Sequence, residues 1–430
     1  MNLVNGKILS AKECETVLAD LKSRIESTLI RGALNPLTVI NAIDKAVKNI
    51  EAGNIERTLA ALGLNSELSA SYLDRAKRQF GKHALRLRLK EELGTDVDEN
   101  GKQDGFAPPF LNRAIKRKVL PLGVLLHIAA GNADGLPAFS VLEGLLTGNI
   151  NILKLPAAGD GVSVAILQEL IAAEPVLSEY IYVFDYSSKD IVNMKRLIDV
   201  SDAVAVWGGT EAVKALRALV PPNVKLIEWG HKVSFCYVDA DAVTDENLTE
   251  LAKHMAQTDQ LLCSSAQGVF VDGGDMGRVY EFCERFLPVL EKARSQKSFD
   301  ESLKAKAALE VYNAELEQIY NGSRLFKGKD CSIIAYEDGE PASAIGFCNV
   351  WAKPLPREKI VATLRPYKNF LQTAGLICLE KDRGGLTDLF FKTGAVRVCP
   401  PAVMSDAYCL MPHDGEYPLR RYTKIVTAET

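Results

Sequence analysis

Residues 203–211 have the sequence Ala-Val-Ala-Val-Trp-Gly-Gly-Thr-Glu, and this stretch decides the fold. Its apolar half predicts a short buried strand over Ala203–Trp207, because a run of apolar residues bounded by glycine is typical of such strands. The sequence after the two glycines predicts a helix over Thr210–Leu219. A strand that passes through a glycine turn into a helix is the repeating unit of a parallel α/β sheet.

The same alternation continues on both sides of this stretch. We expect further strands at Val119–Ile128, Asn149–Leu153, Tyr180–Phe184 and Val224–Ile227, and helices at Leu136–Leu146, Gly161–Ala173 and Asp190–Ile198. These units predict a parallel sheet, and ligands bind to such sheets beyond the carboxyl ends of the strands. The loops after residues 153, 207 and 227 are therefore the places to search for chemistry.

The chain of 430 residues is too long for one ordinary core, so two or more domains are expected. A mostly helical segment, which starts with a capping box at Ser10–Glu13, precedes the first α/β run. A second α/β run begins near residue 232. We predict a helical segment with a first α/β domain over 1–231, a second α/β domain over 232–395, and a C-terminal tail over 396–430 that lies over a neighbouring subunit.

The composition argues against several classes of protein. About a quarter of the residues are charged and the net charge is −4, so no basic excess would draw the chain to nucleic acid or to an anionic membrane. No apolar stretch is long enough to span a bilayer, and the first ten residues lack the pattern of a signal peptide. Nine cysteines, an odd number without a CxxC pair, suggest neither a disulfide framework nor a zinc site. We expect a cytoplasmic protein with free thiols and no metal.

Cys263 is the first candidate for chemistry. It stands in Leu-Leu-Cys-Ser-Ser-Ala-Gln, between a predicted helix and a predicted strand. A thiol in such a polar turn is accessible, and nearby backbone N–H groups favour the nucleophilic thiolate. The alternative is an inert thiol in a core, which is the commoner state of any single cysteine.

Two polar residues near strand ends are candidates for acid–base and oxyanion chemistry. Glu228 ends an apolar strand in Lys-Leu-Ile-Glu, where a carboxylate is placed to act as a general base. Asn132 follows the apolar run that ends at Ala130, and its carboxamide can stabilise an oxyanion. The alternatives are a solvated glutamate and an ordinary turn asparagine.

Two further features are candidates for binding a phosphorylated cofactor. Lys154 ends the predicted strand over Asn149–Leu153, where its ammonium can meet a phosphate or a ribose. The Gly208-Gly209-Thr210 turn lets a pyrophosphate approach the N-terminus of a helix, whose dipole favours negative charge. The alternatives are a solvated lysine and a common glycine turn without a ligand.

Taken in order, these segments resemble the aldehyde dehydrogenase superfamily. Glu-Trp-Gly-His-Lys at 228–232 is similar to the family's Glu-Leu-Gly-Gly-Lys, and Cys263 follows Glu228 by 35 residues, as in the family. Gly148-Asn149, followed by Lys154 and Pro156, is similar to its Gly-Asn then Lys-Pro stretch. The resemblance is good over about 115–275. It implies a Rossmann-type dinucleotide-binding domain and a second, catalytic α/β domain.

Within the superfamily, the chain looks most like the LuxC-type acyl-CoA reductases. The supporting segments are Cys-Ser-Ser-Ala-Gln at 263–267, Trp-Gly-Gly at 207–209, Val-Arg-Val-Cys-Pro at 396–400 and His-Asp-Gly at 413–415. The resemblance implies catalytic roles for Cys263, Asn132 and Glu228. It implies cofactor binding by Lys154, Pro156, Gly208, Gly209, Thr210 and Gly230.

Three departures from the superfamily's pattern bear on the cofactor. Val213 stands where many members have a second glycine, and the segment that holds the nicotinamide ribose has no clear match near 340–355. Ala157 stands where NAD-preferring members often carry a glutamate. Without that carboxylate nothing repels a 2′-phosphate, so we expect NADPH, with NADH as the alternative.

The implied reaction is the reduction of an acyl-CoA, expected to be a fatty acyl-CoA, to the aldehyde through a thioester on Cys263. Three alternatives stay open: a CoA-independent aldehyde dehydrogenase that releases a free acid, an acyl-phosphate reductase, and a non-catalytic subunit that binds an acyl carrier or a synthetase. The resemblance also implies a homo-oligomer, with an acyltransferase or an acyl-protein synthetase as a partner.

Overall fold

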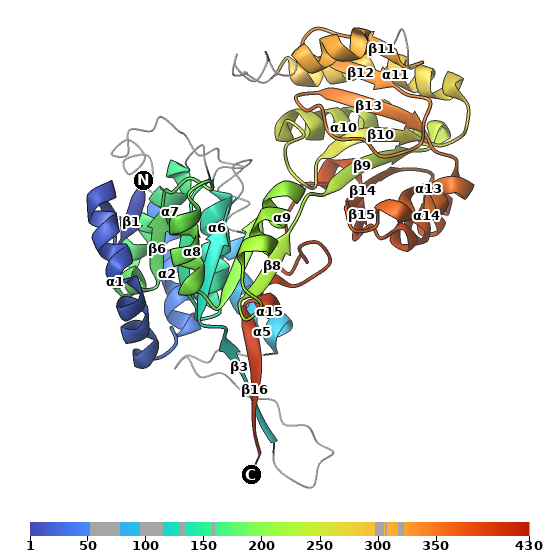
Figure 1. Cartoon of the computed structure of the whole chain (residues 1–430). Helices are drawn as coiled ribbons and strands as arrows, with labels where there is room; N and C mark the ends of the chain where they lie inside the picture. Colours follow the sequence, from blue (N-terminus) through green and yellow to red (C-terminus); the bar gives the residue numbers. More distant parts are fainter. Residues whose placement is uncertain are drawn as a thin grey trace. The chain divides into compact units, whose positions relative to one another are not determined.

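The protein forms two compact α/β units. The computed structural model describes residues 1–51, 78–94, 115–129, 135–156, 160–296, 305, 308–316 and 322–429. Unit 1 consists of Met1–Gly230 together with Ala407–Thr430, and unit 2 consists of His231–Asp406 (Figure 1). Each unit is built on its own seven-stranded sheet.

The sheet of unit 1 has the order β2-β1-β6-β5-β4-β7-β8. Its strands are β1 (Asn2–Val4), β2 (Lys7–Leu9), β4 (Val124–Ile128), β5 (Ile150–Lys154), β6 (Ile181–Phe184), β7 (Ala203–Trp207) and β8 (Lys225–Trp229). The five strands from β6 to β8 run parallel. Chain order reverses between β4 and β7, so this is a doubly wound sheet with its switch point between those two strands.

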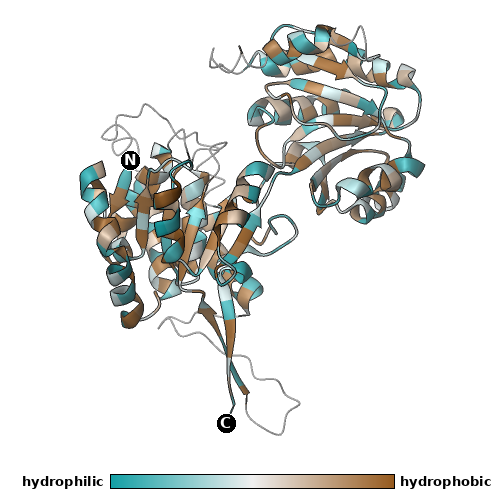
Figure 2. Ribbon diagram, viewed as in Figure 1, coloured by the Kyte–Doolittle hydropathy of each residue, from teal (hydrophilic) through white to brown (hydrophobic). Residues whose placement is uncertain are grey.

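Eight described helices belong to unit 1: α1 (Ala11–Arg31), α2 (Pro36–Glu51), α5 (Lys82–Leu93), α6 (Leu136–Leu146), α7 (Gly161–Ala173), α8 (Ile191–Asp199), α9 (Thr210–Leu219) and α15 (Pro418–Arg421). The capping box predicted at the start of α1 is present, because Ser10 accepts from the backbone of Glu13 and the Glu13 carboxylate accepts in return. Helices α6 and α7 pack together, and α6 covers β4 and β5. The apolar strands lie inside each unit, as Figure 2 shows in brown.

The N-terminal hairpin β1–β2 was not predicted from the sequence. Its turn is Asn5-Gly6, and both residues have positive φ values of 49° and 72°. These values fit a type I′ turn, in which Asn-Gly is the favoured pair. Strand β1 pairs with β6 and so extends the sheet. The strands have only three residues each, too few for an alternation to stand out.

The single strand predicted over Val119–Ile128 is wrong, because the chain turns within it. Strand β3 (Ile115–Pro121) ends before Gly123, and β4 begins after it. Gly123 has a φ of 137°, and a Cβ there would lie 2.1 Å from an Asp202 carboxylate oxygen. That carboxylate accepts a hydrogen bond of 2.8 Å from the backbone of Val124. Apolar residues on both sides conceal this turn in the sequence.

Strand β3 leaves the main sheet and pairs with β16 (Thr423–Glu429), near the C-terminus. The antiparallel register runs from Thr423 opposite Pro121 to Glu429 opposite Ile115. The two strands form a separate ribbon of unit 1 (Figure 1).

The sheet of unit 2 has the order β11-β12-β13-β10-β9-β14-β15, parallel except for β11. Its strands are β9 (Val233–Val238), β10 (Ala266–Val271), β11 (Arg324–Lys327), β12 (Ser332–Ala335), β13 (Asn349–Pro354), β14 (Leu371–Ile377) and β15 (Arg397–Cys399). Its helices are α10 (Asp245–Thr258), α11 (Met276–Arg294), α13 (Ile360–Leu364) and α14 (Glu380–Thr393). Helices α10 and α11 cover one face, and α13 and α14 the other (Figure 1). Each face has its own apolar cluster.

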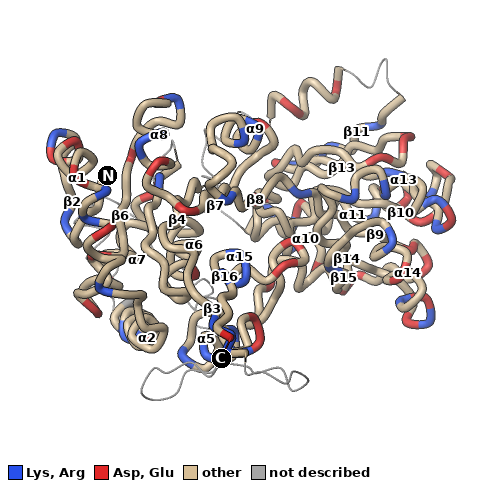
Figure 3. The backbone as a smooth tube through the Cα atoms, turned by 60° about the horizontal axis from the view of Figure 1, so that its bottom comes forward, with Lys and Arg blue, Asp and Glu red and all other residues tan. Residues whose placement is uncertain are grey.

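Residues 396–430, expected as one tail, are divided between the units. Strand β15 pairs with β14 in unit 2, whereas Ala407–Thr430 belongs to unit 1. No described helix has both the length and the apolar character that a membrane crossing requires. Basic and acidic residues are interspersed along the backbone of both units (Figure 3).

Candidate active site

Cys263 lies in the turn that joins α10 to β10 in unit 2. Helix α10 ends at Thr258, and the two residues that follow, Asp259 and Gln260, both have positive φ values, 47° and 58°. The buried Gln260 side chain donates to the carbonyl of Ala266 over 3.0 Å, which braces this unusual backbone. The Cys263 residue itself is half-buried. Cys263 therefore lies in a turn that is partly accessible to solvent. Hydrogen bonds hold the backbone of this turn in one conformation.

Two side chains from neighbouring elements hold this turn. The Ser234 hydroxyl on β9 donates to the carbonyl of Cys263 over 2.6 Å, and it accepts from the backbone of Thr373 over 3.0 Å. On the other side, His254 Nε2 accepts from the backbone of Ala266 over 3.2 Å. Burial lowers the pKa of His254 to about 4, with Arg397 acting in the same direction. The ring is therefore neutral near pH 7, and its proton is on Nδ1.

The other cysteines are either buried or have thiols whose pKa is raised. Five of the nine are buried, and four, including Cys263, are half-buried. Burial raises the pKa of each of the other three half-buried thiols, Cys378, Cys399 and Cys409. Because the thiolate is the reactive form, these groups are held in the inert state. The nucleophilic role of Cys263 stays a prediction, and its surroundings agree with that role.

Lys154 ends β5 at the carboxyl edge of the first sheet. Its residue is only 3% exposed, and burial lowers the pKa of its ammonium although Asp185 partly opposes this. Among the described residues, the one side-chain interaction of its ammonium is the charge–charge contact with Asp185. Pro156, which is buried, follows two residues later. A partly desolvated ammonium favours an oxygen-bearing partner, so Lys154 is suited to a ligand with hydroxyl or phosphate oxygens.

The predicted phosphate turn lies at the same edge. Gly209 is the N-cap of α9 and makes no side-chain cap, so the first N–H groups of this ten-residue helix lack a capping partner. Gly209 and Thr210 are exposed. A Cβ at Gly209 or at Gly230 would meet no atom within 4 Å. The glycines leave open space beside a positive helix end, which is the arrangement that a pyrophosphate requires.

Glu228, on β8, has a partner that the sequence did not indicate. Arg217 of α9 binds both of its carboxylate oxygens. This hydrogen bonding lowers the pKa of Glu228, although burial opposes it. A carboxylate held by a guanidinium accepts protons less readily, so this geometry weakens the case for a general base. Asn132 and Ala157 lie outside the described residues.

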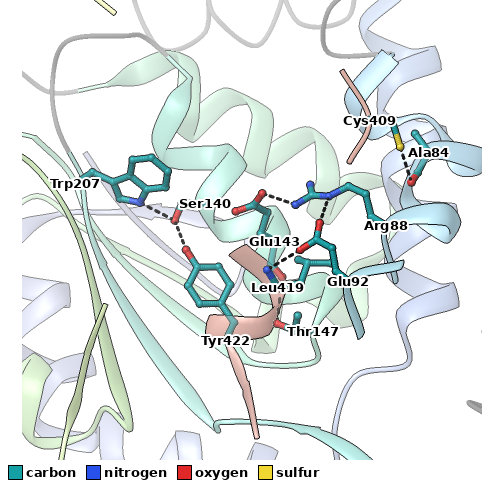
Figure 4. Close-up of polar contacts among 10 residues, drawn as sticks. All are labelled: Ala84, Arg88, Glu92, Ser140, Glu143, Thr147, Trp207, Cys409, Leu419 and Tyr422. Carbon is teal, nitrogen blue, oxygen red and sulfur yellow. Dashed lines mark hydrogen bonds and ion pairs between the residues drawn. The ribbon is translucent and has the colours of Figure 1, made fainter. Parts of the chain in front are cut away.

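A buried polar cluster beneath this edge was also not predicted. Ser140 of α6 accepts from Trp207 Nε1 over 3.1 Å, and its oxygen lies 3.4 Å from the Tyr422 hydroxyl (Figure 4). The same oxygen lies 2.7 Å from His127 Nδ1. His127 Nε2 lies 3.0 Å from the Asn151 carboxamide oxygen, an acceptor, so Nε2 carries the proton. Ser140 therefore donates to Nδ1. Burial lowers the pKa of His127 to about 4.

A second buried group attaches the C-terminal segment to unit 1. Arg88 of α5 binds Glu92 and Glu143, each over 2.8 Å. The Glu92 carboxylate also accepts from the backbone of Leu419 over 3.1 Å (Figure 4). The Glu92 carbonyl accepts from Arg420 over 2.5 Å. The pairs join residues up to 328 positions apart, which a local sequence pattern does not reveal.

The structure thus brings most of the predicted cofactor residues to one edge of unit 1. Lys154 ends β5, Gly208 follows β7, and Gly230 follows β8. The predicted nucleophile Cys263 belongs to unit 2, where it precedes β10.

Comparison with known families decides the membership of this chain. The family described as "Acyl-CoA reductase (LuxC)" matches residues 35–425. The chain belongs to the LuxC family of acyl-CoA reductases.

Relatives in the LuxC family have been named for their activity. The chain is 28% identical over 321 residues to the long-chain acyl-protein thioester reductase of Vibrio harveyi, which covers 73% of this chain and 65% of that protein. It is 27% identical over 218 residues to the reductase of the same name from Aliivibrio fischeri, covering 49% and 44%. The chain thus spans less than two thirds of the length of these relatives.

Solved structures show the fold of this LuxC-family chain. The NAD-dependent aldehyde dehydrogenase of Sinorhizobium meliloti matches all of this chain and 94% of its own, with a TM-score of 0.74 and 14% identity. The succinate-semialdehyde dehydrogenase of Burkholderia pseudomallei matches 96% and 90%, with a TM-score of 0.71 and 15% identity. The predicted aldehyde dehydrogenase fold, with a Rossmann-type sheet and a second α/β unit, is confirmed.

Proposed function

We propose that this chain reduces a long-chain acyl thioester to the aldehyde, with NADPH as reductant and Cys263 as the group that carries the acyl chain. The observation that carries the proposal is the half-buried Cys263, fixed in its turn by Ser234, in a chain of the LuxC family. The preferred substrate is an acyl-CoA. An acyl group on a protein is the second candidate, because the relatives are named for that thioester.

In the first half-reaction the Cys263 thiolate attacks the carbonyl carbon of the acyl-CoA. A new carbon–sulfur bond forms, the bond to CoA breaks, and CoA leaves as a thiol with one proton. The negative charge that develops on the carbonyl oxygen needs donors, and we assign this role to the Cys263 backbone N–H and to the Asn132 side chain. One such donor contributes about 3 kcal/mol to lowering the barrier.

The carboxyl edge of the first sheet fits a dinucleotide. Lys154 offers a buried ammonium, and the α9 N-terminus offers uncapped N–H groups beside the open space at Gly209. We assign Lys154 and Pro156 to one ribose and Gly208, Gly209 and Thr210 to the pyrophosphate, with Gly230 leaving room beside them. When bound, NADPH supplies the hydride.

In the second half-reaction the carbonyl carbon of the Cys263 thioester accepts that hydride. The carbon–sulfur bond then breaks, one proton is taken up, and the products are the aldehyde and the Cys263 thiol. The turn around Cys263 keeps the thioester in one orientation through both steps, because Ser234 and His254 hold its backbone from two sides. Covalent capture thus divides one difficult reduction into two easier steps.

The Arg217–Glu228 pair favours reduction over release of a free acid. A CoA-independent aldehyde dehydrogenase needs a base that activates water, and the guanidinium lowers the pKa of the matching carboxylate. A reductase has no use for that water. We therefore rank the reductase above the free-acid and acyl-phosphate alternatives.

Acyl transfer from labelled palmitoyl-CoA tests the proposal. We expect label on the wild-type protein, its loss as aldehyde when NADPH is added, and no label on Cys263→Ala. Cys378→Ala is the matched control, because this thiol of unit 2 is also half-buried, and it should be labelled as the wild type is. A labelled Cys263→Ala protein would refute the covalent role. Absence of label on the wild type would point to a non-catalytic carrier-binding subunit.

Parallel reactions with an acyl phosphate and with an acylated synthetase separate the substrate classes. Faster aldehyde formation from the acylated protein than from acyl-CoA would move the assignment to the second candidate. Release of free acid that outpaces aldehyde formation would favour the CoA-independent enzyme. NADH in place of NADPH measures the cofactor preference.

We also propose a cytoplasmic homo-oligomer with an acyltransferase or acyl-protein synthetase as partner. The β3–β16 ribbon supports the oligomer, since a two-stranded sheet has no core of its own and Ile425 on it is 63% exposed. Light scattering of the wild type and of Ile425→Lys tests this assignment. An unchanged mass would argue against the ribbon as the interface.

A further inference from the structure

Three aromatic side chains meet at the carboxyl edge of the first sheet. Trp207 ends β7 and Trp229 ends β8, and their rings stack with centroids 5.4 Å apart. The imidazole of His413 lies 4.8 Å from each indole, tilted by 55° to Trp207 and by 80° to Trp229. All three belong to unit 1. His413 comes from the C-terminal segment, and its side chain is 29% exposed.

A tight turn places His413 in this cluster. The backbones of His413 and Glu416 exchange hydrogen bonds of 2.8 and 2.9 Å, and Asp414 and Gly415 between them have positive φ values of 51° and 83°. This is the geometry of a type I′ turn, which fixes both flanking residues. The His-Asp-Gly segment is thus a rigid support that presents the imidazole.

Both tryptophans also have polar or charged partners that fix the position of their rings. The Trp207 indole donates to Ser140, whose hydroxyl group also contacts Tyr422 in the C-terminal segment (Figure 4). The Arg421 guanidinium lies over the Trp229 ring, 5.1 Å from its centroid. Trp229 is 3% exposed, so the accessible surface of the cluster is offered by Trp207, which is half-buried, and by His413. The cluster is a preformed aromatic surface with one open side.

This surface adjoins the phosphate turn. Gly208 directly follows Trp207, and its N–H donates to the carbonyl of Trp229 over 3.2 Å. Lys154 lies at the same edge, but on the other side of the switch point, since the strand order is β5-β4-β7-β8. Strands β5 and β8 are about 14 Å apart at roughly 4.8 Å per strand. That distance is long enough for one half of a dinucleotide to lie near β5 and the other near β8, with the pyrophosphate between them.

We propose that Trp207 and His413, with the buried Trp229 packed behind them, form the surface against which the nicotinamide ring of the bound dinucleotide packs, with His413 as a positioning residue supplied by the C-terminal turn. The inference rests on the proposed function, because it assumes that a dinucleotide binds at this edge. Flat rings gain from offset or edge-to-face contact with aromatic side chains, and a rigid surface loses little entropy on binding. The adenosine half then extends toward Lys154.

Calorimetric titration of two ligands tests this assignment. One is NADPH, and the other is 2′-phospho-ADP-ribose, which lacks only the nicotinamide. We expect His413→Ala to weaken NADPH binding about five- to tenfold and to leave the fragment's affinity unchanged. His413→Phe keeps a flat ring and should bind NADPH within about twofold of the wild type. Tyr408→Ala is the matched control, because this aromatic residue of the same segment is 55% exposed.

A variant of the turn gives a second measure that leaves the imidazole in place. Gly415 has a φ of 83°, which a β-branched residue adopts only with strain, so Gly415→Val should displace His413 and reproduce the selective loss. An equal loss for both ligands, or no loss in either variant, would overturn the inference. A wild-type protein that binds NADPH while His413→Ala binds it equally well defeats this inference alone. A wild type that binds no NADPH defeats the proposed cofactor as well.

Discussion

The two sheets share one architecture, but their carboxyl edges differ. In unit 1 that edge presents Lys154 without an acceptor among the described residues and glycines with open space beside them. In unit 2 the charges at the corresponding edge are paired, because Arg357 binds three carboxylates. Asp239 follows β9, Asp272 follows β10, and Asp382 is on α14. Cys263 lies at the opposite, amino end of β10. The paired charges of unit 2 suit a structural role, whereas the cofactor site that we propose lies at the edge of unit 1.

The largest effect that we expect is acid destabilisation, to which each unit contributes one buried neutral histidine. The pKa values of His127 and His254 are lowered from 6.5 to about 4. The unfolded chain takes up protons below pH 6.5 that the folded chain refuses until about pH 4, so stability falls as the pH falls through this window. Each ring should cost about 2 kcal/mol between pH 7 and pH 5.

Urea unfolding of the wild type and of His254→Asn at both pH values checks this expectation. We expect the variant to be less stable at pH 7, because the shorter Asn side chain replaces the His254 ring that accepts the hydrogen bond from the Ala266 backbone. Its free energy of unfolding should nevertheless fall by about 2 kcal/mol less than that of the wild type between pH 7 and pH 5. Parallel pH dependence of the two proteins would show that His254 is not neutral in the folded state.

The secondary structure was predicted well where the signal is local. Helices α6, α7 and α9 and strand β7 begin and end at the predicted residues, because each is a periodic run bounded by glycine, proline or a capping residue. The signal fails at Gly123, where apolar residues on both sides of a turn look like one strand. Asn5-Gly6 was a hairpin signal, but its strands were too short to be noticed.

The candidate site was predicted in part for a similar reason. Lys154 and the Gly208 turn follow strands, and strand ends are visible in the sequence. The partner of Glu228 was not predicted, because Arg217 lies on α9 and Glu228 lies on β8, 11 residues later, and no local pattern links the two. His413 was noticed only as part of a resemblance, since its contacts with Trp207 depend on how the C-terminal segment returns to unit 1.

The next largest effect concerns the edge of unit 1. Lys154→Met should weaken NADPH binding by about 2 kcal/mol, roughly thirtyfold, because a charged hydrogen-bond donor to the cofactor is lost. Stability should not fall, because the variant removes a buried ammonium that has no acceptor among the described residues. Binding calorimetry and urea unfolding measure both quantities. A destabilised variant with normal affinity would assign Lys154 to the fold instead.

Arg357→Met gives the opposite result at the corresponding edge of unit 2. Removal of the guanidinium leaves the Asp239 carboxylate, which is 5% exposed, without its partner. Breaking a buried pair costs 3 kcal/mol or more, but Arg357 is one-third exposed, so we expect about 2 kcal/mol. The affinity for NADPH should be unchanged, because Arg357 is paired with carboxylates of unit 2 and lies outside the cofactor site that we propose. A loss of affinity at full stability would contradict the distinction between the two edges.

The smallest effect should come from Glu228, although the carboxylate stands at the edge of the proposed cofactor site. Arg217 lowers the pKa of the Glu228 carboxylate, so this group pairs with the guanidinium and accepts a proton less readily. Glu228→Gln should therefore change the rate of aldehyde formation less than about threefold, well below the 10²–10⁴-fold contribution of a general base.

Any slow hydrolysis of the acyl-enzyme should be slowed more by Glu228→Gln than its reduction, since only hydrolysis needs an activated water. Single-turnover measurements with acylated Cys263, with and without NADPH, separate the two. Equal losses in both half-reactions would restore Glu228 as a base that acts on the thiol itself.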